Sequence, residues 1–310
     1  MDKAPFYNDL AEGPKGGSAW WLMTQDGRRV RVGHWPGGDK GTVLLFPGRT
    51  EYIEKYGRSA TMLGANGYGT VCIDWRGQGM ADRLDDDPML GHIGHFTDYQ
   101  MDVAALVAFA REQELPQPWF LLAHSMGGCI GLRALHQGLA VNAAVFSAPM
   151  WGIGMSDLVR PFAWAVSYGA DMIHRGTIRT PGTKPGAYVQ ITAFKDNTLT
   201  GDPNQYAYMQ RHVTAVAEFG LGGPSLRWLH QALLETRKLR AKKPPSYPAM
   251  TFLGGREEIV HRQSVHDVMQ RWENAEFVID PEAKHEFPME TAPIRTRFFT
   301  ESMRLFAQNA

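Results

Sequence analysis

The chain has no excess of charge of either sign. Its 310 residues include 32 lysines and arginines and 32 aspartates and glutamates, so the formal net charge is zero. A strongly basic surface, which is typical of nucleic-acid-binding proteins, is therefore not expected. The one basic run, 237–243, is short and typical of a solvated helix end, although it leaves a transient contact with a membrane surface open. No nucleic-acid partner is predicted.

Cysteines and long apolar runs are also scarce. The two cysteines, Cys72 and Cys129, stand in apolar surroundings, which is typical of buried free thiols in a reducing compartment. No run of about eighteen apolar residues exists, so no transmembrane segment is expected. Residues 1–5 lack the apolar stretch of a secretion signal. We therefore predict a cytoplasmic protein, and the composition predicts no particular oligomeric state.

Metal-ligand patterns are absent as well. His92 and His95 form one close pair, and His261 and His266 form another. Neither pair has further Cys, Asp or His ligands at a spacing typical of a metal site. We predict neither a metal nor a cofactor.

Short apolar runs alternate with helical patterns along most of the chain. Runs without polar alternation are typical of strands covered on both faces, so the order predicts an α/β fold with a mostly parallel sheet and helices on both faces. An Asp26-Gly27 pair predicts a hairpin near the N-terminus. The expected strands are 20–24, 29–35, 42–46, 69–74, 119–123, 143–147, 249–253 and 276–279, and the expected helices are 53–66, 99–114, 127–137, 263–272 and 292–307.

This rhythm is interrupted between residues 151 and 247. The stretch is rich in Trp, Tyr, Met and Gly, has helical pieces and contains no strand-like run longer than 188–191. We interpret residues 151–247 as a helical cap, or lid, inserted into a core formed by residues 1–150 and 248–310. An insertion that lies over the ends of the strands is where a ligand pocket is expected to form. The candidate substrate-binding residues are Trp151, Ile153, Trp164 and Trp228.

A serine at a sharp strand-to-helix turn is the most informative feature of the sequence. The apolar run 118–123 ends at a His-Ser pair, and the small residues 127–131 then begin a helical pattern. This order is typical of a nucleophile elbow, in which the serine hydroxyl stands clear of the sheet beside a helix N-terminus. Ser167 lies in a similar short pattern, but no glycine-rich helix start follows it. The context favours Ser125 as the nucleophile.

An acid and a histidine follow Ser125 at the ends of two later strands. A serine hydroxyl needs a base to take its proton and an acid to orient that base. Glu257 and Glu258 follow the strand 249–253, and His285 follows the next strand. The order of serine, acid and histidine is that of α/β-hydrolase enzymes. We predict a catalytic triad of Ser125, His285 and one of the two glutamates.

Two backbone donors of an oxyanion hole are also predicted, because a tetrahedral intermediate needs N–H donors. One is the amide of Met126, directly after the nucleophile, and the other comes from the loop after the strand 42–46. Arg49 is placed in this loop to donate its backbone N–H, and Gly48 allows a close approach. The side chain of Arg49 is expected to be solvated or paired with Glu51.

Several motifs resemble those of the lysophospholipase and monoacylglycerol lipase group of α/β-hydrolases. Residues 47–56 (PGRTEYIEKY) follow the pattern of the family's His-Gly stretch, with Pro47 in place of the histidine. Residues 74–79 (DWRGQG) are similar to its Asp-x-Arg-Gly-x-Gly loop, and residues 283–286 (AKHE) to its histidine motif. Ala123 replaces the first glycine of the elbow.

The resemblance extends to the acid and to the cap. The family's acid stands two residues before an Ile-Val pair, which implies Glu257 rather than Glu258 as the third member of the triad. Within the cap, residues 197–202 and 222–228 resemble bacterial lysophospholipases more than generic esterases.

The resemblance implies a cofactor-free serine hydrolase that cleaves the single acyl ester of a lysophospholipid or monoacylglycerol through an acyl-enzyme on Ser125. Two alternatives stay open. One is an esterase or amidase that acts on a small non-lipid substrate. The other is a ligand-binding relative without catalysis, which only Pro47 motivates and which an intact set of Ser125, Glu257 and His285 argues against.

Overall fold

Nine strands form a single sheet in the order β1-β2-β3-β5-β4-β6-β7-β8-β9. The structure is a computed structural model that describes residues 1–310. The pairs from β1 to β5 along this order are antiparallel, and all pairs from β5 to β9 are parallel. The strands are β1 (Lys3–Ala4), β2 (Ser18–Met23), β3 (Arg29–Trp35), β4 (Thr42–Phe46), β5 (Gly69–Asp74), β6 (Trp119–His124), β7 (Ala143–Ser147), β8 (Ala249–Gly254) and β9 (Ala275–Asp280).

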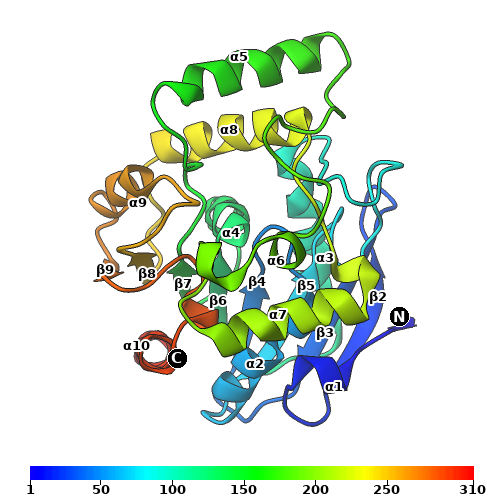
Figure 1. Ribbon diagram of the computed structural model, residues 1–310. Coiled ribbons are helices and arrows are strands. Elements are labelled where there is room, and N and C mark those ends of the chain that lie inside the picture. The colour runs from blue at the N-terminus through cyan, green and yellow to red at the C-terminus, as the bar shows by residue number, and fades with distance from the viewer.

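Helices lie on both sides of this sheet (Figure 1). The α-helices are α1 (Asn8–Ala11), α2 (Gly57–Gly64), α3 (Tyr99–Glu112), α4 (Met126–His136), α5 (Val159–Met172), α6 (Tyr188–Ile191), α7 (Pro203–Ala215), α8 (Leu226–Ala241), α9 (Arg262–Met269) and α10 (Ala292–Gln308). Short 3-10 helices are Ile53–Tyr56, Phe96–Asp98, Phe194–Asp196, Ala217–Phe219 and Phe287–Met289.

The central strands supply two separate apolar layers, because successive side chains of a strand point to opposite faces. Leu44 of β4 belongs to a buried cluster with residues of α3, α4, α8 and α9. Val43, its neighbour in the chain, belongs to a second cluster with residues of α2 and α10. Cys129 lies in the first layer and Cys72 in the second, and both are free and buried.

The fold expected from the sequence is confirmed. All eight predicted strands are present with boundaries that differ by a residue or two, and the hairpin forms at Gly27, whose φ of 75° favours glycine. Two details differ. The expected helix 53–66 begins as the 3-10 helix Ile53–Tyr56 before α2, and the strand-like run at residues 188–191 is the helical turn α6.

Between β7 and β8 the chain forms four α-helices and adds no strand to the sheet. We refer to residues 151–247 as the helical segment. Within it α8 packs against α4 and α9, so it continues the layer that covers the sheet. Helix α5 packs mainly on the outer side of α8, at the top of Figure 1. None of the helices combines the length and apolar character that crossing a membrane requires.

Candidate active site

Ser125 lies between β6 and α4 in a strained backbone conformation. Its φ of 50° and ψ of −116° are rarely adopted by a residue with a side chain. The chain is tightly packed around this turn. A Cβ on Gly127 would collide with the carbonyl oxygen of Phe46, and one on Gly128 would collide with Pro149. The small residues that follow the serine therefore permit the close contact of helix and strand on which the turn depends.

His285 and Glu257 form a buried pair at the ends of β9 and β8. The His285 Nδ1 lies 2.7 Å from Glu257 Oε2. The other oxygen of Glu257 accepts hydrogen bonds from the backbone N–H groups of Ile259 and Val260, at 2.6 and 3.0 Å. Glu258, in contrast, is exposed and has no such contact. The structure thus brings the glutamate favoured by the resemblance, and not its neighbour, to the histidine.

Electrostatics within the pair favour an ionised glutamate. Burial raises the pKa of the Glu257 carboxyl, but His285 and the two backbone N–H groups lower it by more, so the net shift of the pKa is downward. Burial lowers the pKa of His285, but the charge and hydrogen bond of Glu257 raise it above the ordinary value. A carboxylate at Nδ1 fixes the proton on that nitrogen, which leaves Nε2 as the base.

Ser167, the alternative nucleophile, is placed in a different setting. It is fully buried in the middle of α5, and its hydroxyl donates to the carbonyl oxygen of Ala163 at 2.6 Å. Such a bond is ordinary for a serine inside a helix.

Two backbone amides beside Ser125 have no partner within the protein. Neither the N–H of Met126 nor that of Arg49 takes part in the hydrogen bonds of the structure, whereas the N–H of Gly48 is bound by the Glu51 carboxylate. The loop that carries Arg49 is held from the other side as well. Trp75 Nε1 donates to the Pro47 carbonyl at 2.9 Å. A proline at position 47 is therefore compatible with a well-anchored loop.

The expectation for the Arg49 side chain is wrong. It is neither solvated nor paired with Glu51. Its Nη2 donates to the carbonyl oxygen of Gly222 at 2.7 Å, and its guanidinium lies over the Trp228 ring, 5.2 Å from the centroid. Glu51 pairs instead with Lys55, at 2.6 Å. Gly222 lies in the loop before α8 and Trp228 lies on α8. Both are too far from Arg49 in the sequence for these contacts to have been expected.

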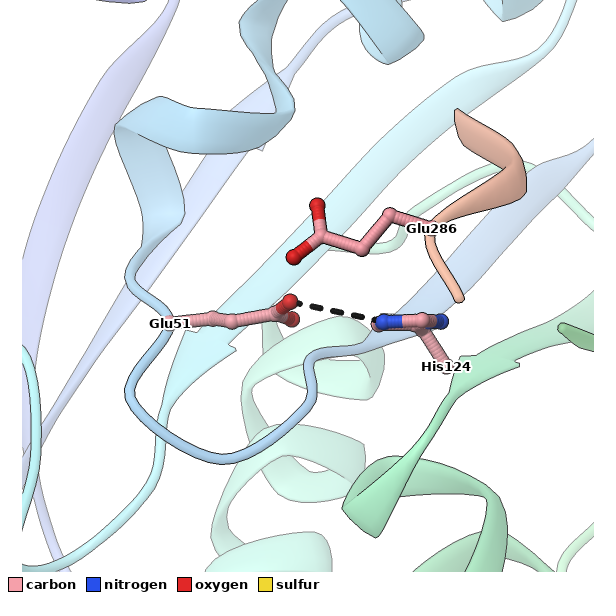
Figure 2. A group of neighbouring side chains, drawn as sticks. All are labelled: Glu51, His124 and Glu286. Carbon is pink, nitrogen blue, oxygen red and sulfur yellow. Dashed lines mark ion pairs between the residues drawn. The ribbon is translucent and has the colours of Figure 1, made fainter. Parts of the chain in front are cut away.

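A buried polar cluster behind the histidine was not predicted. Figure 2 shows Glu51, His124 and Glu286 turned toward one another from three separate segments. His124 Nε2 lies 3.5 Å from Glu51, and the His124 ring lies 4.8 Å from that of His285. The only sequence signal was proximity, because each of the three is next to or close to a predicted site residue.

Lys55 supplies the positive charge of this cluster. Its Nζ lies 2.6 Å from a carboxylate oxygen of Glu51 and 2.6 Å from one of Glu286. Burial raises the pKa of Glu51, but the charge and hydrogen bond of Lys55 bring it down to about 2. Burial is also the main cause that lowers the pKa of His124 to about 3, so this ring is neutral. Three side chains here have metal-ligand chemistry, and the Lys55 ammonium lies close to both of the carboxylates among them.

One cavity of about 360 Å³ connects these groups to the helical segment. Ser125, His285 and the Arg49 loop form its polar end. The remainder is mostly apolar and comes largely from the helical segment, through residues that include Val189, Leu199, Met209, Val213 and Phe219. The arrangement is that of a ligand site with a few polar groups at one end of an apolar pocket.

The four candidate residues of the helical segment divide into two pairs. Ile153 and Trp228 line the cavity. Trp151 does not, because it is fully buried in the layer below and its Nε1 donates to the Gly128 carbonyl at 3.1 Å. Trp164 does not line it either, since it packs edge-on against His230 on the outer side of α8. Only the first pair is placed to touch a ligand near Ser125.

The fold and this arrangement define the molecule as an α/β-hydrolase. The chain belongs to the family described as serine aminopeptidase, S33, whose model matches residues 37–292. The resemblance drawn from the motifs is thereby confirmed.

Individual relatives are similar over most of the chain. Lysophospholipase L2 of Escherichia coli (strain K12) is 32% identical over 73% of this chain, and the match spans 66% of that protein, just under two thirds of its length. The probable lysophospholipase L2 of Haemophilus influenzae is 28% identical over 82% of this chain and 79% of its own length. Among solved structures, a soluble variant of monoglyceride lipase from Saccharomyces cerevisiae has a TM-score of 0.73 with 19% identity, covering 93% of this chain and 94% of that one. At this identity the likeness supports the fold alone.

Proposed function

We propose that this protein is a serine hydrolase that cleaves the single acyl ester of a lysophospholipid or monoacylglycerol. The observation that carries the proposal is the buried His285–Glu257 pair, whose histidine lines the same apolar-walled cavity as the strained Ser125. The relatives named as lysophospholipases support the lipid substrate. We assign Ser125, Glu257 and His285 as the triad, with no cofactor.

The proposed reaction follows from the placement of these groups. Ser125 Oγ attacks the ester carbonyl while His285 Nε2 takes the hydroxyl proton, and Glu257 stabilises the resulting imidazolium. The oxyanion accepts hydrogen bonds from the backbone N–H groups of Arg49 and Met126. The C–O bond to the alcohol then breaks, and His285 returns its proton to the departing oxygen. Water then attacks the acyl-enzyme while His285 takes its proton, and as the bond to Ser125 Oγ breaks, His285 passes that proton to Oγ and the fatty acid is released.

The apolar lining of the cavity supports a monoacyl substrate. Its apolar walls suit one acyl chain, and we propose that Ile153 and Trp228 contact that chain. Each methylene transferred from water to such a pocket contributes about 0.8 kcal/mol. Specificity should therefore rise with acyl length until the cavity is filled, and diacyl phospholipids should be poor substrates.

We further propose that residues 151–247 act as a lid and that α5 touches the surface of lipid aggregates transiently. Large apolar side chains of α5 are exposed to solvent, among them Phe162 (72% exposed), Val166 (49%) and Met172 (63%). An apolar helix face of this kind at the protein surface is suited to the boundary between head groups and acyl chains. The location in the cytoplasm stays a prediction.

Labelling with a fluorophosphonate probe, together with a substrate series, tests the proposal. Wild type and Ser167→Ala should be labelled and active, whereas Ser125→Ala should be neither, because loss of a triad member costs several powers of ten in rate. Long-chain monoacyl esters should exceed acetyl and butyryl esters in kcat/KM below the critical micelle concentration. A preference for acetyl esters would indicate a non-lipid esterase instead, and an unlabelled wild type would indicate a binding protein.

A further inference from the structure

A second cavity adjoins the first on the far side of Arg49. It has a volume of about 350 Å³ and shares Arg49, Thr50, Tyr188 and Pro224 with the apolar cavity. Its character is different, because much of its wall is glycine backbone and hydroxyl groups from residues 182–192 and 221–224. Only two charged side chains line it, Arg49 and Lys184, and both are cations. No carboxylate is among its lining residues.

Arg49 holds its charge at this boundary without an acidic partner. The residue forms no ion pair, and its single side-chain hydrogen bond goes to the carbonyl oxygen of Gly222. Its Nε is buried and has no hydrogen-bond partner. Burial lowers the pKa of the guanidinium to about 10, so it is still a cation at neutral pH. A guanidinium that lines a cavity without a counter-charge would be stabilised by an anionic ligand there.

The acidic side chains near Arg49 are paired with other groups. Glu51, two residues away, is bound by Lys55 and by the N–H of Gly48. Asp87, on the other side, is paired with Arg179 at 2.5 Å. Lys184 is exposed and forms no ion pair. Two cations with no anion between them therefore face the second cavity.

We propose that Arg49 and Lys184 bind the phosphodiester of a lysophospholipid head group in the second cavity, while the acyl chain occupies the first. This inference rests on the proposed function and narrows it to a phosphate-bearing substrate. Arginine offers planar, multiple N–H donors that suit phosphate oxygens. The backbone amide of Arg49 is the proposed oxyanion donor and its side chain lines the second cavity, so one residue would span the short distance between ester and phosphate in such a lipid.

The same geometry discriminates against an uncharged monoacylglycerol. That substrate offers hydroxyl groups but no negative charge to the second cavity, and the guanidinium would stay without a counter-charge. A site built to bond a polar group rejects an analogue that lacks it more strongly than an apolar pocket rejects a missing methylene. We expect wild type to favour the phospholipid.

The test compares kcat/KM for lysophosphatidylcholine and for a monoacylglycerol with the same acyl chain, each below its critical micelle concentration. Arg49→Gln keeps the backbone amide. It should lower the ratio of kcat/KM for lysophosphatidylcholine to kcat/KM for the monoacylglycerol by about tenfold or more, since about 1.4 kcal/mol of lost interaction is a factor of ten. Arg49→Lys should restore part of the ratio. Lys184→Ala should lower it by a smaller factor, because this side chain is exposed.

Arg237→Gln is the matched control, because it removes one positive charge from an exposed face of α8 outside both cavities. It should leave the ratio unchanged. A ratio that Arg49→Gln does not change, or changes no more than Arg237→Gln does, would overturn the proposal. Glycerophosphocholine should inhibit wild type more strongly than inorganic phosphate does at the same concentration. The reverse order would point to a site for free phosphate instead. Failure of the proposed function is separately visible as loss of labelling and of hydrolysis of both substrates.

Discussion

The sheet and the outermost helix use apolar residues in opposite ways. Every residue of β4, β6, β7 and β8 is buried, and β4, β6 and β8 end just before the turns and loops that carry Arg49, Ser125 and Glu257. Helix α5 instead leaves Phe162 72% exposed, and the neighbouring Leu158 and Ile173 are 83% and 69% exposed. Burial on both faces holds these strands in place, whereas the exposed apolar surface of α5 is not used by the fold. The contrast separates the part of the molecule that positions the proposed triad from the part that we propose touches lipid aggregates.

The largest effect should come from the sheet side, at the acid. Glu257→Gln should lower kcat by about two to four powers of ten, because only the residue bonded to His285 stabilises the imidazolium. Glu258→Gln is the matched control, since the exposed Glu258 does not contact the histidine. Steady-state hydrolysis of one long-chain ester by both variants measures the difference. Equal rates for the two variants would contradict the assignment of the acid.

The pH dependence should report the same pair. His285 acts as base in its neutral form, and its pKa is raised above the ordinary value by Glu257. For wild type, kcat/KM should therefore fall as the pH drops through an apparent pKa above 6.5. In Glu257→Gln the carboxylate is lost, so the apparent pKa should move downward. An apparent pKa that is the same in both proteins would show that another group titrates.

A second effect should come from the buried lysine. Lys55→Met leaves the carboxylates of Glu51 and Glu286 buried without their common cation, and it should lower the free energy of unfolding by about 3–5 kcal/mol. Lys243→Met, which breaks an exposed pair with Glu273, should change it by less than about 1 kcal/mol. Urea denaturation measures both. Similar losses for the two variants would show that the cluster does not stabilise the fold.

The smallest effect should come from α5. Phe162→Ser removes an exposed aromatic ring, so the free energy of unfolding should change little, while binding to phospholipid vesicles should weaken several-fold. Hydrolysis of a monomeric ester should be unaffected, because Phe162 does not line the cavity. Vesicle sedimentation and the monomer assay together sharpen the contrast between the two regions. Unchanged sedimentation would remove α5 from the proposed contact with lipid.

The sequence was sufficient for features that are local. The central strands were predictable because most are short apolar runs, the hairpin strands because they flank Asp26-Gly27, and the turn at Ser125 because small residues follow it directly. Partners far apart in the chain were not predictable. Arg49 bonds to Gly222, 173 residues away, and Lys55 joins Glu51 to Glu286. Composition also misled, because Trp151 was assigned to the substrate pocket, but its side chain completes the layer below.

Each face of the sheet carries one buried cysteine, and the rate at which that thiol is chemically modified reports how often the face opens. Burial raises the pKa of both thiols well above the ordinary value, and only the thiolate reacts with disulfide reagents. Cys129 lies among the residues packed by α3, α4 and α8, and Cys72 among those packed by α2 and α10. The modification rate of each sulfur in the folded protein is thus set by how often its own layer opens. Comparing the modification rates of Cys72 and Cys129 would show which side of the sheet opens more often, without introducing a new residue into the chain.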